Sequence, residues 1–100
     1  MRRKPAPRPA PFQIHGEIDL SNAGELARQL EQYAATTTGD LVVDCHDMTF
    51  IDSSGLHALV RLQQRLTEMG RRIVLERLQA NCGRVFELGG LDHYFNLQTA

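Results

Sequence analysis

The chain has 100 residues, of which 42% are hydrophobic, and this is enough for one small domain with a single core of modest size. Four of its 11 basic residues fall within the first eight positions, so residues 12–100 hold 7 basic and 12 acidic residues, a net charge of −5. An acidic body argues against nucleic acid as the main partner, and we predict no direct nucleic-acid binding.

Membrane insertion, a disulfide framework and a metal site are also not predicted. The chain has no apolar run of about 20 residues, as a membrane span needs, and its N-terminus lacks the apolar stretch of a secretory signal. Cys45 and Cys82 lie beside apolar sequence, as reduced buried thiols do, and the histidines have no metal-ligand spacing. We therefore predict a cytoplasmic protein without a cofactor.

The N-terminal segment has an unusual composition. All four prolines of the chain stand at positions 5, 7, 9 and 11, alternating with Ala and Arg. Proline removes backbone donors and favours extended polyproline geometry. We predict a flexible basic tail over residues 1–11 and a single domain over residues 12–100.

A strand and an amphipathic helix are predicted next. In FQIHGEIDL apolar and polar residues alternate, which predicts a strand over residues 12–18 with apolar positions running as far as Leu20. Asn22 followed three residues later by Glu25 is typical of a capping box at a helix start. The apolar stripe of this helix, which ends before Gly39, comprises Ala23, Leu26, Ala27, Leu30, Tyr33 and Ala34.

Strands and helices continue to alternate in the second half of the chain. LVVDCH predicts a short strand at residues 41–46, RRIVLERL a third strand and HYFNL a last short strand. ANCGRVFELGG predicts a short helix capped by Asn81, and a longer helix runs from Gly55 to Gly70. The apolar stripe of this longer helix comprises Leu56, Leu59, Leu62, Leu66 and Met69. Such alternation predicts an α/β domain with a mainly parallel or mixed four-stranded sheet and about three helices.

The junction Asp52-Ser53-Ser54-Gly55 follows the second strand after an intervening HDMTF segment and opens the longer helix. In parallel α/β sheets, sites form where strand ends meet helix starts. One interpretation, which the local pattern alone favours, is structural: Ser53 or Ser54 caps the helix and Gly55 lets the chain turn. The other is a switch, because a phosphate would bring about −1.5 to −2 charges to an exposed serine at a helix start that tolerates them.

A catalytic serine is not supported by these residues. The motif G-x-S-x-G fails for both serines, because Ile51 and Asp52 stand where its first glycine is needed. His57 lies on the same helix, where it is poorly placed to act as a base. A nucleotide loop of the type G-x-x-x-x-G-K-[ST] is absent, and we predict that the chain is not an enzyme.

Four segments match the motifs of one protein family. FIDSSGLHALVRL has D-S-S-G-L after an apolar segment and at a helix start, and IHGEID ends in G-E-I-D. LVVDCHDMTFIDSSGL has the pattern of a strand-loop-helix core, and LQANCGRVFELGGLDHYF that of a closing segment with a short helix before G-L. In these features, which cover about residues 13–97, the chain resembles the STAS domain and specifically the bacterial anti-sigma factor antagonists.

This resemblance implies a phosphorylation-controlled partner switch. In the family, the unphosphorylated antagonist binds an anti-sigma factor that is also a serine kinase, and this frees a sigma factor. The kinase phosphorylates the antagonist and releases it, and a serine phosphatase resets it. The phosphorylated serine is the first of the pair, which corresponds to Ser53. The partner-binding residues carried over from the motifs are Asp19, Asp52, Ser54, Gly55 and Leu56.

The proline-rich N-terminus departs from the family pattern, in which an additional strand precedes the one that matches FQIHGEID. Because proline hardly donates to a ladder, we expect an exposed sheet edge, a candidate for a homodimer or for contact with another protein. The alternative function keeps the fold without the switch: a phosphorylation-independent STAS adaptor subunit of a transporter or lipid-trafficking complex, with Ser53 only a cap. The Ser-Ser pair after Asp52 favours the switch, because an adaptor needs no exposed hydroxyl there.

Overall fold

Three strands and three helices make up the fold, which we describe for residues 10–97 of a computed structural model. The elements are, in chain order, β1 (Phe12–Ile18), α1 (Ala23–Ala35), β2 (Leu41–Ile51), α2 (Ser53–Glu68), β3 (Ile73–Glu76) and α3 (Ala80–Leu88). Most of the tail predicted over residues 1–11 lies outside the described residues.

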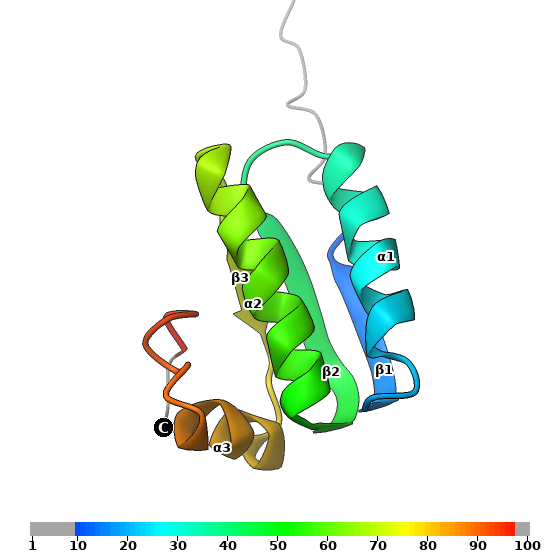
Figure 1. Cartoon of the computed structure of the whole chain (residues 1–100), viewed down its shortest axis with the longest axis vertical. Coiled ribbons are helices and arrows are strands. Elements are labelled where there is room, and N and C mark those ends of the chain that lie inside the picture. Colours follow the sequence, from blue (N-terminus) through cyan, green and yellow to red (C-terminus); the bar gives the residue numbers. More distant parts are fainter. Residues whose placement is uncertain (1–9, 98–100) are drawn as a thin grey trace, which may run out of the picture.

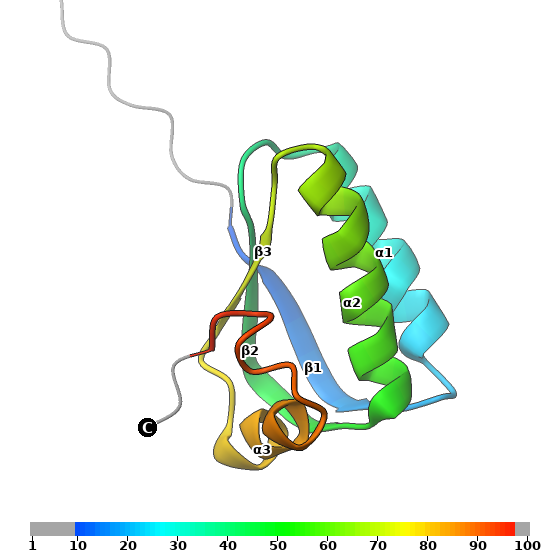
Figure 2. The same ribbon diagram turned by 60° about the vertical axis from the view of Figure 1, so that its left-hand side comes forward.

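The sheet and two of the helices form two layers. The strand order is β1-β2-β3, all pairs are parallel, and α1 and α2 lie side by side on one face of the sheet (Figures 1 and 2). Successive helices fall on the same face when each strand-helix-strand unit crosses over in the same sense. The third helix, α3, lies at the end of the sheet at which β1 and β2 end (Figure 1).

The second strand is longer than the strand predicted at residues 41–46, because HDMTF is part of it and it ends at Ile51. It pairs with β1 from Phe12↔Val43 to Ile18↔Ile51, and two register irregularities let it carry extra residues along the seven of β1. Bulges of this kind accommodate extra residues without ending the pairing. The two strands therefore end at the same level.

The described residues contain three strands, one fewer than predicted, because HYFNL forms turns. Its backbone bonds are local: the N–H of Phe95 donates to the carbonyl of Leu91, and that of Leu97 to the carbonyl of Asp92. Phe95 is 4% exposed and packs edge-to-face on Phe86 of α3, with ring centroids 5.6 Å apart. One anchoring aromatic ring in a turn thus accounts for the apolar pattern that suggested a strand.

The capping box predicted at the start of α1 does not form. The Oδ1 of Asn22 accepts a hydrogen bond from the N–H of Asp19 at 2.9 Å, and its Nδ2 donates to the carbonyl of Glu17 at 2.7 Å. Glu25 does not reach back to Asn22 and pairs with Arg28 one turn later. The Asn22 amide therefore stabilises the turn between β1 and α1. The prediction that it caps the helix is wrong.

The third helix is held against β2 by its first turn. The Nδ2 of Asn81 donates to the carbonyl of Thr49 at 2.8 Å, and the thiol of Cys82 to another β2 carbonyl at 3.5 Å. Asn81 is therefore not the predicted cap, and Gln79 occupies that position without a side-chain bond to the helix. Cys82 and Cys45 are free and buried, as predicted, and burial raises the pKa of the Cys45 thiol to about 12.

The core lies between the two helices and the sheet and is formed largely by the predicted apolar stripes. The helices bury Ala23, Leu26, Leu30 and Ala34 from α1 and Leu56, Leu59, Leu62 and Leu66 from α2. The strands contribute Ile14, Ile18, Leu41, Val43, Ile51 and Ile73. Met69 was predicted to belong to the α2 stripe, but it is 60% exposed because the helix ends at Glu68.

One carboxylate is buried in the sheet. Asp44 of β2 is 7% exposed and accepts hydrogen bonds from the guanidinium of Arg77, through Nε at 3.1 Å and through a second nitrogen, and from the N–H of His46 at 3.0 Å. The Arg77 hydrogen bond is the main cause that holds the pKa of Asp44 below its usual value. Arg77 has a left-handed φ of 56°, so this pair joins the end of β3 to β2 at a bend in the chain.

Asp44→Asn is expected to destabilise the domain near neutral pH and to have progressively less effect in acid. Because the folded-state pKa of Asp44 is lowered, its stabilising contribution is present above the unfolded value of 3.8 and is lost as the pH falls below it. Urea denaturation from about pH 7 to about pH 2 measures this. Asp40→Asn is the control, because Asp40 is exposed and has no hydrogen bond within residues 10–97. A difference between wild type and Asp44→Asn that is constant with pH would contradict the prediction.

Candidate functional site

Two of the predicted site residues, Asp19 and Asp52, are neighbours at the carboxyl edge of the sheet. The last paired residues of β1 and β2 are Ile18 and Ile51, and each aspartate follows one of them. The N–H of Asp52 donates to the carbonyl of Ile18 at 3.1 Å, which extends the ladder by one bond. Adjacent strands lie about 4.8 Å apart, so the two backbones run side by side at this point. The structure thus brings together two acidic residues that are distant in the sequence.

The N-cap of α2 is Asp52, and neither serine of the pair has this role. Its Oδ1 accepts hydrogen bonds from the N–H groups of Ser54 and Gly55, at 2.8 and 3.3 Å. The structural interpretation that Ser53 or Ser54 caps the helix is therefore wrong. Ser53 is the first residue of the helix, it is exposed, and its hydroxyl has no hydrogen-bond partner within residues 10–97.

Asp19 is held by the turn that follows β1. Its Oδ1 accepts hydrogen bonds from the hydroxyl and the N–H of Ser21, at 2.5 and 2.9 Å. The Ser21 hydroxyl is the main cause that lowers the pKa of Asp19, so this carboxylate is ionised at neutral pH. The backbone carbonyl of Asp19 accepts hydrogen bonds from the N–H groups of Asn22 and Ala23, and these bonds connect the same turn to the start of α1.

Gly55 is required by close packing and not, as predicted, by a turn. A Cβ at this position would lie 2.6 Å from the Cγ1 of Ile51 and 2.9 Å from the Cγ2 of Ile18. The start of α2 therefore lies directly on the ends of β1 and β2, and this contact sets the position of Ser53. Leu56 is 7% exposed and belongs to the core. Gly55 and Leu56 thus shape the site from beneath its surface.

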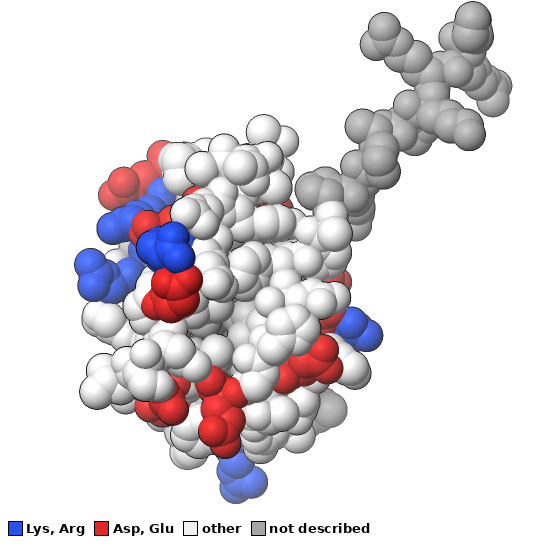
Figure 3. All heavy atoms as spheres, turned by 90° about the vertical axis from the view of Figure 1, so that its right-hand side faces the viewer, with Lys and Arg blue, Asp and Glu red and all other residues white. Residues whose placement is uncertain are grey.

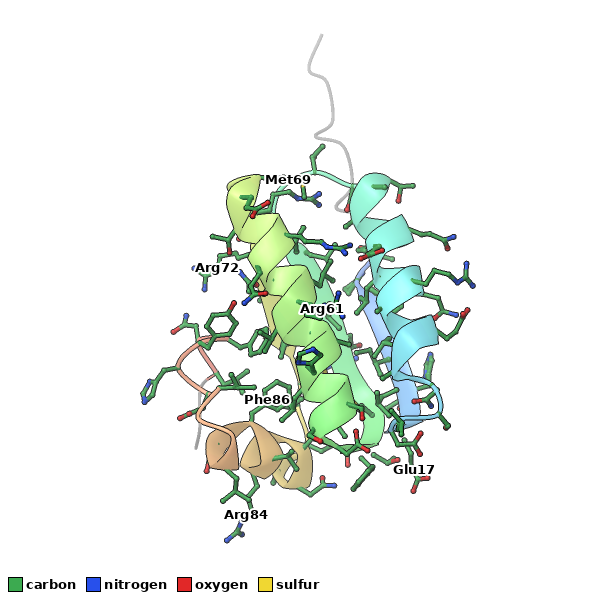
Figure 4. The ribbon with its side chains drawn as sticks, in the orientation of Figure 1. Glu17, Arg61, Met69, Arg72, Arg84 and Phe86 are labelled. Atoms are coloured by element: carbon green, nitrogen blue, oxygen red, sulfur yellow. The ribbon has the colours of Figure 1, made fainter. Side chains whose placement is uncertain are left out.

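A groove of about 760 Å³ between α1 and α2 opens beside this junction. Ser53, His57 and Arg61 line it from α2, and the small residues Gly24 and Ala27 line it from α1. Figure 4 shows Arg61 midway along α2 and Glu17 near the end of β1. The candidate phosphorylation site therefore lies at one end of a groove with a basic wall.

Leu20 is the feature of this site that the sequence interpretation missed. It was expected to continue the buried face of β1, but the strand ends at Ile18 and Leu20 is 82% exposed in the turn, where it lines the groove. Its position after Asp19 was the available signal, because G-E-I-D marks the end of the strand. An exposed leucine beside an exposed serine is suited to contact with a protein partner.

Acidic side chains gather at the strand ends. On the face drawn in Figure 3, several acidic side chains lie in the lower part of the molecule, the end at which β1 and β2 end, while basic and acidic side chains lie together higher up. The acidic end includes Glu17, Asp19 and Asp52. On α2 the groove is lined by Arg61 and Arg65. Ser53 therefore lies between an acidic end and a basic groove wall.

Neither a metal site nor a membrane helix is found in the part of the chain that the structure describes. Residues 10–97 contain no group of three or more His, Cys, Asp or Glu side chains that could hold a metal ion. Among the helices of the same residues, none is long and apolar enough to cross a membrane.

Comparisons with known proteins agree with this architecture. The model of the STAS domain family matches residues 4–100. Anti-sigma-B factor antagonist from Staphylococcus aureus (strain NCTC 8325 / PS 47) is 27% identical over 78 residues, which cover 78% of this chain and 72% of that protein. Anti-sigma-B factor antagonist from Listeria monocytogenes is 28% identical over 86 residues, which cover 86% of this chain and 75% of that protein.

The chain therefore belongs to the STAS domain family. The resemblance predicted from D-S-S-G-L and G-E-I-D is confirmed, and the named relatives are anti-sigma factor antagonists.

Gly55→Ala is expected to destabilise the domain by about 1 to 3 kcal/mol, because the new methyl group would overlap the side chains of Ile18 and Ile51. Gly24→Ala is the matched control, since a Cβ at Gly24 meets nothing within 4 Å. This control should be neutral or stabilising by up to about 1 kcal/mol, because alanine is the better helix former. Denaturant unfolding of both variants measures the difference, and equal stabilities would show that α2 does not depend on the close contact.

Proposed function

We propose that this chain is an anti-sigma factor antagonist whose partner binding is controlled by phosphorylation of Ser53. Its proposed partner is an anti-sigma factor with serine kinase activity, which it binds when Ser53 is unphosphorylated, so that a sigma factor is freed. A serine phosphatase would return the phosphorylated form to the binding state. In this proposal the chain is a cytoplasmic binding protein and performs no catalysis itself.

The observation that carries the proposal is the Ser53 hydroxyl, which is exposed and has no hydrogen-bond partner among residues 10–97. Because Asp52 caps α2, the Ser53 hydroxyl is not used by the helix, and Ser53 is exposed in the groove that Leu20 also lines. A serine that capped the helix would instead accept a backbone N–H of the first turn. The names of the two relatives, at 27% and 28% identity, support the same class of function.

The proposed modification is an ordinary phosphoryl transfer. The Oγ of Ser53 attacks the γ-phosphorus of ATP bound to the kinase, the new O–P bond forms, and the bond to the β-phosphate oxygen breaks. A base of the kinase takes the hydroxyl proton, and ADP leaves. The chain itself contributes only the accessible hydroxyl and the helix start that tolerates the added charge.

Release of the partner follows from charge and bulk. A partner surface that contacts Ser53 also meets the carboxylates of Asp19 and Asp52, so it has to be complementary to an acidic edge. A phosphate adds about −1.5 to −2 charges there, and burying them without enough cations is costly. We therefore propose that binding is lost while the fold of the antagonist is unchanged.

Intact mass spectrometry after incubation with the cognate kinase and ATP tests the modification site. Wild type should gain one phosphate, Ser53→Ala none, and Ser54→Ala one, because Ser54 is partly buried while Ser53 is exposed. Ser54→Ala is the matched control for the loss of one hydroxyl at this junction. A phosphate on Ser53→Ala would move the site to Ser54 or Thr49 and refute the assignment.

Calorimetric titration against the anti-sigma factor tests the switch. The phosphorylated protein should bind at least about tenfold more weakly than the unphosphorylated protein, since one unpaired charge at an interface costs well over 1.4 kcal/mol. Ser53→Asp should weaken binding only partly, because one carboxylate has less charge and fewer acceptors than a phosphate. Amide NMR spectra of both forms should differ only near Ser53. Equal affinities would favour the phosphorylation-independent adaptor, and shifts across the whole sheet would mean that the domain rearranges.

A further inference from the structure

Three residues of α2 form a row along the groove. Ser53, His57 and Arg61 are spaced by four and all line the cavity between α1 and α2. Helix residues four apart lie one above the other, with Cβ atoms about 5 to 6 Å apart, and their side chains lean toward the helix N-terminus. The imidazole of His57 is therefore the basic group nearest to Ser53 on this face of the helix.

His57 and Arg61 have no bonded partner within the described part of the chain. Neither side chain takes part in a hydrogen bond or ion pair there, and both are exposed. The other cation of the groove, Arg65, pairs with Glu31 of α1. The groove therefore presents an imidazole and a guanidinium that no anion of residues 10–97 engages.

The acidic groups at the strand ends are already engaged by hydrogen-bond donors. Asp19 accepts from Ser21, and Asp52 accepts from the N–H groups of the first turn of α2. The other charged groups that line the groove with His57 are Glu31 from α1 and Arg61 and Arg65 from α2. The two aspartates stand at the ends of β1 and β2 and are not among the residues that line the groove. An anion carried by Ser53 would be the one closest to His57 along the helix.

We infer that His57 is the intramolecular counterion of phosphorylated Ser53. The inference rests on the proposed phosphorylation and adds what happens to the phosphate afterwards. The protonated imidazole pairs with the phosphate across one helical turn, and Arg61, one turn further along, extends the positive potential of the groove. The phosphate of the released protein is therefore drawn toward the α1–α2 groove, beside Leu20 and away from solvent on that side.

This pair depends on pH near neutrality. The second ionisation of phosphoserine and that of histidine both have ordinary pKa values near 6 to 6.5. In a pair, the dianionic phosphate favours the protonated imidazole and the protonated imidazole favours the dianion, so the two groups titrate together. The ion pair is strongest where both are charged and weakens as the pH moves away in either direction.

The test uses protein in which phosphoserine is incorporated at position 53 during translation, so that no kinase is needed. A ³¹P NMR titration gives the second pKa of the phosphate. We expect this pKa to be roughly 0.3 to 0.7 unit lower with His57 present than in His57→Gln, the size of an exposed charge pair.

His93→Gln is the matched control, because it makes the same chemical change at a side chain that is 99% exposed and outside the groove. It should leave the phosphate pKa unchanged. An identical phosphate pKa in wild type and His57→Gln would overturn the inference, even if Arg61→Gln shifted that pKa. Because the phosphate is introduced without the kinase, this result is independent of the mass-spectrometric test. A kinase that fails to modify Ser53 would refute the proposed function, whereas the titration reports only on the pairing with His57.

Discussion

The site depends on the common end of β1 and β2. The register places Ile18 opposite Ile51, and the N–H of Asp52 completes the ladder on the carbonyl of Ile18. Because Gly55 has no side chain, the start of α2 can rest directly on these two isoleucines. A slip of β1 by one residue against β2 would turn the buried side chains of β1 to the opposite face and move Asp19 away from Asp52. The position of Ser53 is therefore a consequence of strand pairing and of one close helix-to-sheet contact.

An acid as the N-cap gives the serine pair its chemical freedom. Had Ser53 capped the helix, its oxygen would accept a backbone N–H and would be a poorer acceptor for modification. Asp52 takes this role and adds a charge that is favourable at a helix N-terminus. The same residue thus stabilises α2, leaves the hydroxyl of Ser53 unbonded, and contributes to the acidic edge that a partner meets.

Charge is divided around Ser53, and this division relates the two proposals. On one side the carboxylates of Asp19 and Asp52 make the strand ends acidic. An added phosphate therefore weakens the binding of a partner whose surface is complementary to this edge. On the other side the groove presents His57 and Arg61 without partners in the described chain. A phosphate that is repelled from a partner interface therefore has a basic wall of its own protein to approach.

The sequence by itself determined the class of fold, the order of the elements and the position of the site. Apolar periodicity located β1, α1 and α2. A helix that covers a core repeats its apolar residues about every 3.6 residues, and a strand repeats them every second residue. The motifs D-S-S-G-L and G-E-I-D identified the family, since they combine a strand end with a helix start. These features are local, and neighbouring residues are sufficient to specify them.

Only the tertiary structure decided which polar group binds which. Asn22 and Asn81 have the chemistry of caps, yet their amides bond to the β1–α1 turn and to β2, because a side chain takes the partner that folding brings near. The extension of β2 to Ile51 needed the pairing with β1, and the turn at Phe95 needed the ring of Phe86. The exposure of Leu20 and the choice of Asp52 over Ser53 as the cap likewise depend on where the strands end. Contacts between segments distant in the chain set these features, and local sequence patterns do not contain them.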